Sequence, residues 1–150
     1  MSENVLYILM RNDLPSLGPG RAAAQSSHAS NAFWRKFGCA KSVEEWADST
    51  HQGFGTAIVL SATIYQIDNL IKKAGQQGIF SGQIVDPDYA ITISYELVPF
   101  LDKNLKDIKV EQSEKDPTKY IIHRQEITCG YIFGDKESLE PLLGDLPLYS

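Results

Sequence analysis

Several features are scarce in this chain of 150 residues, and each scarcity narrows the kind of protein it encodes. The chain contains no run of 18 apolar residues, so we expect no membrane-spanning helix. It has only two cysteines, Cys39 and Cys129, whose spacing matches no metal-binding or redox motif, so we expect no bound metal and two reduced thiols, with a disulfide between them as the alternative. The first four residues lack the basic start of a signal peptide, which favours a cytoplasmic location.

Length and composition are those of an ordinary globular protein. Hydrophobic residues make up 43% of the chain and charged residues 22%. A chain of this length can bury a substantial core, and its sequence contains no internal repeat or low-complexity tract. We therefore expect one domain over residues 1–150.

Charge is unevenly distributed along the chain, whose formal net charge is −5. Residues 1–41 contain five basic and two acidic side chains, whereas residues 42–150 contain nine basic and 17 acidic ones. The overall charge argues against a dedicated nucleic-acid binder, but a local positive patch could hold a phosphate backbone. The alternative is that these five cations are scattered over the surface.

Strands and helices are predicted to alternate along the chain. Three apolar runs are typical of buried strands, at residues 5–10, 56–60 and 79–85, and the last of them ends at Asp86-Pro87. Helical spacing predicts helices over residues 20–36 and 63–77. Ser42 and Glu45 match a capping box that opens a short helix. This order predicts an α/β fold, a three-layer α/β/α domain around a mixed sheet of about four strands.

The segment at about residues 90–124 is predicted to be a hairpin-like insertion. Residues 106–112 and 119–125 alternate like two strands around a turn at 113–117. A last sheet strand is expected at residues 127–133, and Asp135 is a candidate cap for the final helix.

The junction between the first strand and the first helix is the most informative segment. A Gly-rich turn leads into this helix, and helix N-termini bind anions because their N–H groups and dipole point outward. Arg21 lies in the first turn, and Arg21, Gln25 and His28 are spaced so that they share one helix face. The alanines of the helix are expected to let it pack closely on a sheet. The simpler interpretation of the polar row is a solvated stripe on an amphipathic helix.

This segment resembles the opening of the archaeal/eukaryotic-type peptidyl-tRNA hydrolases. The resemblance rests on Met10-Arg11-Asn12-Asp13-Leu14, then Gly20-Arg21, then Ala23-Ala24-Gln25-Ser26-Ser27-His28-Ala29. Weaker similarities follow at Trp46, at residues 57–60, 64–78 and 83–86, and at the C-terminal residues 139–149. The resemblance implies hydrolysis of the ester between peptide and tRNA by a positioned water, without a cofactor. It also implies the tRNA acceptor end as substrate, and several members of the family are homodimers.

The resemblance assigns roles to individual residues. Arg21 would bind a phosphate or the oxyanion, and Asp86 would orient or deprotonate the water. His28 would complete this catalytic group by hydrogen bonding to the substrate, or would make a structural hydrogen bond. The alternative for Asp86 is a turn cap before Pro87. A Ser27–His28 nucleophile is disfavoured, because adjacent helix residues point about 100° apart. The residues expected to contact substrate are Arg11, Asp13, Gly20, Gln25, Ser27, Thr92 and Thr128.

Two positions depart from the family pattern. Ala90 and Ile127 stand where the family has threonines, and Thr92 or Thr128 would have to replace those hydroxyls. The second hypothesis is therefore a catalytically impaired module that binds tRNA or a protein partner, with the insertion as contact surface. A third is an ester or amide hydrolase acting on another acyl substrate. Asn12 and Asp13 could orient Arg21 or serve only the turn.

Overall fold

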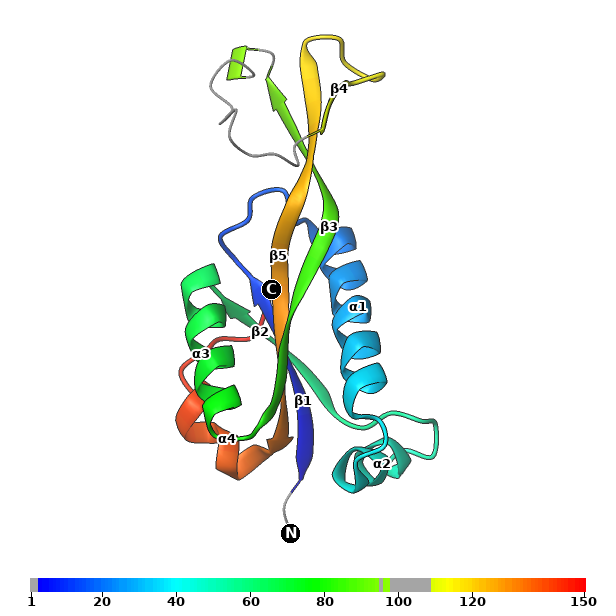
Figure 1. The fold of residues 1–150 in the computed structure, drawn as a ribbon, viewed down its shortest axis with the longest axis vertical. Coiled ribbons are helices and arrows are strands. Elements are labelled where there is room, and N and C mark those ends of the chain that lie inside the picture. The colour runs from blue at the N-terminus through cyan, green and yellow to red at the C-terminus, as the bar shows by residue number, and fades with distance from the viewer. Residues whose placement is uncertain (1–2, 95, 98–108) are drawn as a thin grey trace. The chain divides into compact units, whose positions relative to one another are not determined.

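A computed structural model describes residues 3–94, 96–97 and 109–150 (Figure 1). The strands are β1 (Asn4–Arg11), β2 (Ala57–Ala62), β3 (Phe80–Ser94), β4 (Lys109–Gln112) and β5 (Lys119–Asp135). The helices are α1 (Pro19–Phe37), α2 (Lys41–Asp48), α3 (Ile64–Gln76) and α4 (Lys136–Leu143). The chain divides into two compact units, Met1–Ile84 with Thr128–Ser150, and Val85–Ile127.

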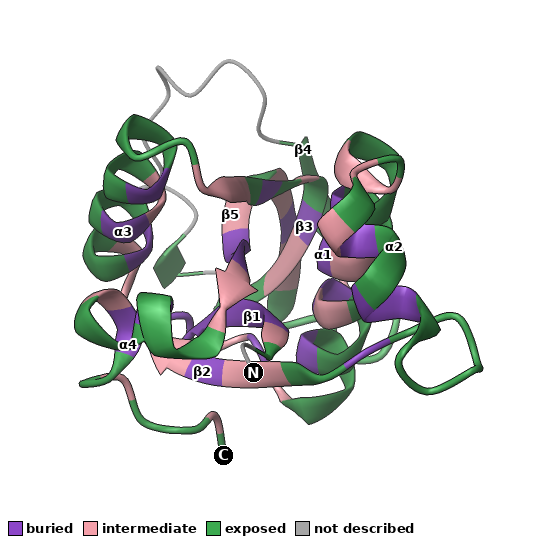
Figure 2. Ribbon diagram, turned by 90° about the horizontal axis from the view of Figure 1, so that it is seen from below, coloured by how far each residue is buried: buried purple, intermediate pink, exposed green. Residues whose placement is uncertain are grey.

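The sheet is mixed and follows the order β2-β1-β5-β3, with β4 paired to β5. β1 runs parallel to β2 and antiparallel to β5. In the first unit, α1 and α2 cover one face of the sheet and α3 and α4 cover the other (Figure 2). The predicted three-layer α/β/α fold is confirmed, and none of the helices in the described residues is long and apolar enough to span a membrane.

β1 is the central strand of the first unit, and this explains its composition. It lies between β2 and β5, and every residue from Val5 to Arg11 is buried. A strand covered on both faces carries a continuous apolar run instead of alternating apolar and polar residues. On one face, Val5 and Leu9 pack with residues of α3 and α4. On the other face, Phe33 of α1 contacts the rings of Trp46, Tyr131 and Phe133.

α1 packs on the sheet with two of the five alanines that were predicted to do so, Ala22 and Ala29. Its buried side chains are Ala22, Gln25, Ala29 and Phe33, which recur at helical spacing. Ala23, Ala24 and Ala32 are exposed, so the expectation that they pack against the sheet is wrong. The helix ends at Phe37, with Gly38 as its C-cap, close to the predicted end.

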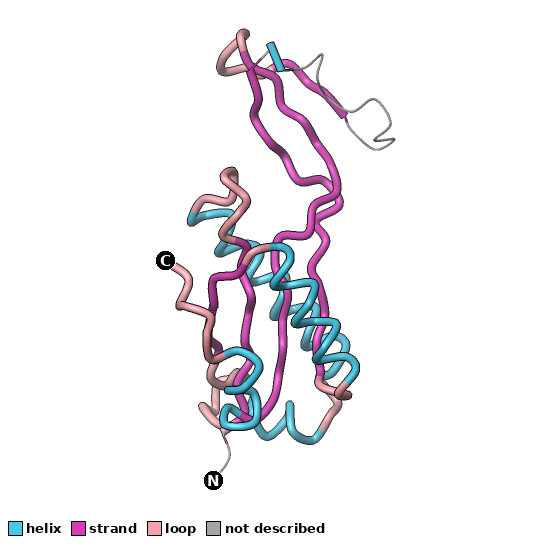
Figure 3. The backbone as a smooth tube through the Cα atoms, turned by 90° about the vertical axis from the view of Figure 1, so that its left-hand side faces the viewer, coloured by secondary structure: helices cyan, strands magenta, loops and turns pink. Residues whose placement is uncertain are grey.

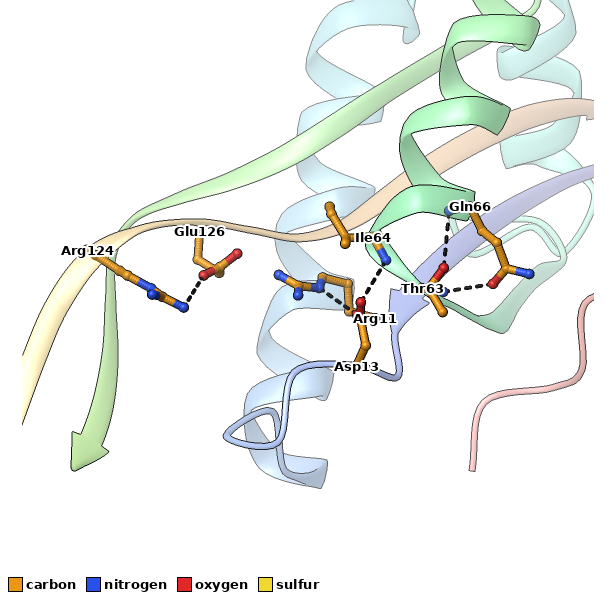
Figure 4. Close-up of polar contacts among 7 residues, drawn as sticks. All are labelled: Arg11, Asp13, Thr63, Ile64, Gln66, Arg124 and Glu126. Atoms are coloured by element: carbon orange, nitrogen blue, oxygen red, sulfur yellow. Dashed lines mark hydrogen bonds and ion pairs between the residues drawn. The ribbon is translucent and has the colours of Figure 1, made fainter. Parts of the chain in front are cut away.

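The predicted capping box at Ser42 and Glu45 is also wrong. The N-cap of α2 is Ala40, two residues before the predicted cap, because the carbonyl of Ala40 accepts the N–H groups of Val43 and Glu44 at 2.9 and 3.0 Å. This start buries Val43, Trp46 and Ala47. A capping box is present at the start of α3 instead (Figure 4). There the Thr63 hydroxyl accepts the Gln66 N–H at 3.2 Å, and the Gln66 side chain accepts the Thr63 N–H at 2.8 Å.

The third strand does not end at Asp86-Pro87, as the sequence predicted, but continues to Ser94. β3 is the last strand in the sheet order, so its backbone pairs on one side only. Proline lacks the N–H needed in a ladder, but it is tolerated where that N–H would face away from the neighbouring strand. Pro87 therefore does not terminate the strand.

The second unit contains the predicted hairpin. β4 pairs antiparallel with β5, with Lys109 opposite His123 and Gln112 opposite Tyr120. Residues 106–108, predicted as part of the first hairpin strand, lie outside the described residues. The predicted break between residues 125 and 127 is wrong, because β5 is one continuous strand from Lys119 to Asp135 (Figure 3).

The C-terminal elements close the first unit. The Asp135 carboxylate caps α4 by accepting the Ser138 N–H at 3.0 Å, as predicted. The tail then returns along β2, where Leu148 pairs with Leu60. This pairing covers part of an otherwise open sheet edge.

Candidate functional site

The start of α1 follows β1 closely and concentrates positive charge. Gly18 is the N-cap, and among the described residues no side chain caps this helix start and no acidic residue lies in its first turn. Helix N-termini carry a partial positive charge, which Asp, Glu or a capping oxygen usually offsets. Here Arg21 adds a full positive charge, with its Nη1 3.5 Å from the carbonyl oxygen of Ser16. The arrangement is unfavourable for the helix alone and suited to an anion.

The structure separates the three polar residues that were predicted to share one face of α1. Arg21 and His28 are exposed, as are Gly20 and Ser27. Gln25, in contrast, is buried, with 4% of its surface accessible. The predicted solvent-facing row therefore contains Arg21 and His28, while Gln25 belongs to the packed side.

Gln25 joins α1 to the sheet through Thr128. The Thr128 hydroxyl donates to Gln25 Oε1 at 2.7 Å, and Thr128 is fully buried. The neighbouring thiol of Cys129 lies 3.6 Å from the Gln25 carbonyl oxygen, and burial raises the pKa of this thiol to about 12. Cys129 is therefore a protonated, unreactive thiol, and Gln25 and Thr128 hold the helix in place.

Replacing Thr128 with valine tests this role. The variant keeps the side-chain shape but leaves the buried Gln25 oxygen without its hydroxyl donor, so we expect a loss of about 1–3 kcal/mol in the free energy of unfolding. Urea denaturation measures it. The control is Thr92→Val, an exposed strand position where a change within about 0.5 kcal/mol is expected. Equal effects of the two substitutions would contradict the role of Thr128.

Arg11 and Asp13 form a second polar connection at the end of β1 (Figure 4). Asp13 accepts a hydrogen bond from Arg11 Nε at 2.9 Å and another from the Ile64 N–H at 3.1 Å. Arg11 is largely buried. Burial raises the pKa of Asp13, but the Arg11 and Ile64 hydrogen bonds and the Arg11 charge outweigh it, so the net pKa is lowered. These contacts tie the end of β1 to the first residue of α3.

The lowered pKa of Asp13 makes its contribution to stability pH-dependent. A carboxylate whose pKa is lower in the folded protein contributes stability at pH values above its pKa in the unfolded chain, about 3.9. This contribution is lost as the pH falls through the folded-state pKa. We expect Asp13→Asn to reduce the free energy of unfolding by about 1–2 kcal/mol at pH 7. The difference in free energy of unfolding between the wild type and this variant, the stability gap, should narrow below about pH 4. Asp145→Asn, at an exposed carboxylate, is the control; a gap that stays constant to pH 2 would contradict the assignment.

Asp86 and Thr92 belong to the second unit and lie in β3. Asp86 is partly buried, and its Oδ1 accepts the Asp88 N–H at 3.0 Å. This is the local bond expected of an Asp preceding Pro87. Thr92 is exposed, and Ala90 is partly buried.

Charged residues of the hairpin form a cluster that the sequence did not reveal. His123 Nδ1 lies 3.2 Å from Asp88, and its Nε2 lies 3.4 Å from Glu111, so one side chain of β5 bridges β3 and β4. Arg124 pairs with Glu126 at 2.8 Å on the same strand (Figure 4). His123 and Glu111 come together only through the register between β4 and β5. The local sequence pattern contains no signal for this contact. Among the residues that the structure describes, no three His, Cys, Asp or Glu side chains could hold a metal ion.

Comparison with known proteins identifies one matching family. The family model described as Peptidyl-tRNA hydrolase PTH2 matches residues 4–94. The matched segment extends from the start of β1 to the end of β3 and includes Arg21, His28 and Asp86. No curated protein matches the chain.

Proposed function

We propose that this chain, which belongs to the PTH2 family of peptidyl-tRNA hydrolases, cleaves the ester that joins a peptide to the 3′ end of tRNA. The observation that carries the proposal is the start of α1. Its first turn lacks a side-chain cap and an acidic residue, and Arg21 adds a cation there. The family motif and this concentration of positive charge coincide at the same residues.

The reaction requires water and no second substrate. The oxygen of water attacks the acyl carbon, and the carbonyl oxygen takes up negative charge in the tetrahedral intermediate. The bond from this carbon to the ribose 3′ oxygen then breaks, and the leaving oxygen takes a proton. The products are a peptide with a free carboxyl group and a tRNA with a free 3′ hydroxyl. A catalyst must supply a positive group for the oxyanion and a group that handles the proton.

Arg21 supplies the positive group in this proposal. A guanidinium remains charged at any working pH and can donate two parallel hydrogen bonds to a phosphate or an oxyanion. It cannot act as a base. Its exposure at an uncapped helix start supports the role, because the helix dipole and the side chain favour the same anion.

Asp86 handles the proton in this proposal. The support is the similarity of residues 83–86 to the family's third strand, within the matched segment. A carboxylate can orient a water or accept its proton. The hydrogen bond from the Asp88 N–H engages Oδ1 of Asp86, so the side chain has a defined local geometry.

The remaining residues fall into two groups. His28 is exposed on the same helix face as Arg21, and we assign it to hydrogen bonding with the substrate. Gln25 and Thr128 bond to each other in the interior, and we assign them to positioning α1. By the same reasoning, we assign Asp13 to holding the β1–α1 loop in place, by its hydrogen bonds with Arg11 and Ile64.

Peptide release in ¹⁸O-labelled water tests the proposal. Purified protein is incubated with peptidyl-tRNA, and the released peptide is analysed by mass spectrometry. Hydrolysis at the acyl carbon places one ¹⁸O atom in the peptide carboxyl group and leaves the tRNA unlabelled. Absence of accelerated release over the protein-free reaction would refute the hydrolase assignment.

A second candidate function is a binding module without turnover. The observation that favours it is that the family match ends at residue 94, whereas the chain continues into the β4–β5 hairpin. Replacing residues 95–123 with a short linker would then abolish binding of tRNA or of a protein partner, and the purified protein would release no peptide. Unchanged binding in this variant would refute the module.

A further inference from the structure

The segment that follows α4 returns along β2 and is attached to that strand by its backbone (red in Figure 1). The Ser61 N–H donates to the Pro147 carbonyl oxygen at 2.8 Å, and the Tyr149 N–H donates to the Val59 carbonyl oxygen at 3.0 Å. Two backbone bonds to one strand fix the course of this segment. The backbone of Tyr149 is therefore held by the sheet, which gives its half-buried side chain a defined origin.

The side chain of Tyr149 reaches the loop between β1 and α1. Its hydroxyl donates to the carbonyl oxygen of Leu17 at 3.5 Å, although the two residues are 132 positions apart in the chain. Leu17 directly precedes Gly18, the N-cap of α1. The distance is longer than the usual 2.7–2.8 Å or so for a hydroxyl donor, so we expect a modest contribution from this bond. The bond nevertheless acts on the last residue before the helix that carries the candidate site.

Three consecutive carbonyl groups at this helix start accept hydrogen bonds from three different donors. The Ser16 oxygen accepts from Arg21 Nη1 at 3.5 Å, the Leu17 oxygen accepts from the tyrosine hydroxyl, and the Gly18 oxygen accepts from the Ala22 N–H at 2.9 Å. Because peptide planes are rigid, a displacement of the Leu17 carbonyl also turns the planes on either side of it. The position of Leu17 therefore affects both the Arg21 side chain and the first turn of α1.

The other end of the same loop is also fixed relative to β2. The Asn12 N–H donates to the Ala62 carbonyl oxygen at 2.9 Å, and Asp13 accepts the N–H of Ile64, two residues after that strand. Tyr149, whose backbone bonds to β2, holds the end that leads into α1. Both ends of the loop therefore take their position from one strand of the sheet.

We propose that Tyr149 is a positioning residue of the candidate site, which holds the Leu17 carbonyl and thereby fixes the helix start from which Arg21 projects. The inference rests on the proposed function, in which Arg21 binds the oxyanion or a phosphate. A displacement of about 1 Å in a catalytic arrangement can lower a rate about 100-fold, so a modest bond at this place has a large effect on activity. Tyr149 acts through Leu17, without contact with the substrate.

Removal of the hydroxyl alone is the first test, and it does not require activity. Tyr149→Phe keeps the ring and both backbone bonds of the segment. Native-state hydrogen exchange measured by NMR should show the Leu17 and Ala22 amides exchanging about two- to ten-fold faster than in the wild type. The matched control is Tyr65→Phe, which removes a hydroxyl from a side chain that is 83% exposed and should leave both rates unchanged. Wild-type exchange rates in Tyr149→Phe would overturn the proposal.

A double-mutant cycle separates positioning from general stabilisation. Tyr149→Phe should lower kcat/KM for peptidyl-tRNA about ten-fold in the wild type. In protein that already carries Arg21→Ala, the same change should lower it by less than about two-fold, because the side chain that the hydroxyl positions is absent. Tyr65→Phe should have no effect in either background. Equal factors for Tyr149→Phe in the two backgrounds would overturn the proposal, because they would show stabilisation of the fold without positioning of Arg21.

The outcomes distinguish this inference from the hydrolase assignment. Peptide release no faster than in the protein-free reaction would refute the hydrolase assignment, and the exchange rates would still decide whether Tyr149 holds the loop. Accelerated release, with Tyr149→Phe equal to the wild type in both exchange and kcat/KM, would refute the positioning role alone.

Discussion

Replacement of Arg21 by alanine is expected to lower kcat/KM for peptidyl-tRNA by about 100- to 1000-fold, the usual cost of removing one group that stabilises an oxyanion. The side chain is exposed at an uncapped helix start, and the helix gains nothing from a cation there. Because the side chain is exposed, its removal should change the free energy of unfolding by no more than about 0.5 kcal/mol. A loss of activity without a loss of stability identifies a functional side chain.

The division of the effect between kcat and KM reports what Arg21 binds. A fall in kcat at saturating substrate indicates the oxyanion, whereas a rise in KM alone indicates a phosphate held equally before and during the reaction. Arg21→Lys is the control that keeps the charge but loses the paired donors. If Arg21→Ala retained wild-type kcat and KM, the assignment of the site to the start of α1 would be wrong.

Asp86→Asn is expected to lower kcat by about 100- to 10,000-fold while tRNA binding is retained. Asparagine keeps the side-chain oxygen that accepts the Asp88 N–H, so the local backbone bond is preserved while the proton-accepting carboxylate is lost. A single-turnover measurement at saturating protein gives kcat separately from binding.

The neighbouring carboxylate Asp88 provides the matched control for Asp86. It is exposed and pairs with His123, and we assign it no part in the reaction. Asp88→Asn should leave kcat within about two-fold of the wild type. If both substitutions reduced kcat by the same factor, the effect would be a general property of this part of β3, and the role assigned to Asp86 would be refuted.

Local sequence patterns predicted the elements of the first unit well, because each pattern reflects one dominant interaction. The apolar run of β1 follows from burial on both faces, and the helical spacing of Ile67, Leu70 and Ala74 follows from packing on one face. The Asp135 cap was also predictable, because capping depends on residues three positions apart. The continuation of β3 through Pro87 was not predictable. A proline interrupts a central strand but is tolerated in an edge strand, and local sequence does not show which position a strand takes in the sheet.

The candidate site was predictable only where its residues are neighbours in sequence. The motif placed Arg21 and His28 on an exposed helix face, as the structure has them. It could not show that Gln25 turns inward, because the partner that buries it, Thr128, is 103 residues away. The same limit applies to Asp13, whose second hydrogen bond goes to Ile64. Contacts between distant segments depend on strand register and helix placement, which spacing does not encode.

The most direct test of the hydrolase assignment is a single-turnover measurement of peptide release from peptidyl-tRNA at saturating wild-type protein. Saturation removes differences in affinity, so the rate reports only the chemical step. We expect release far above the protein-free rate, strongly reduced in both Arg21→Ala and Asp86→Asn. If bound peptidyl-tRNA instead kept its ester for as long as it does in free solution, the protein would bind this substrate without hydrolysing it.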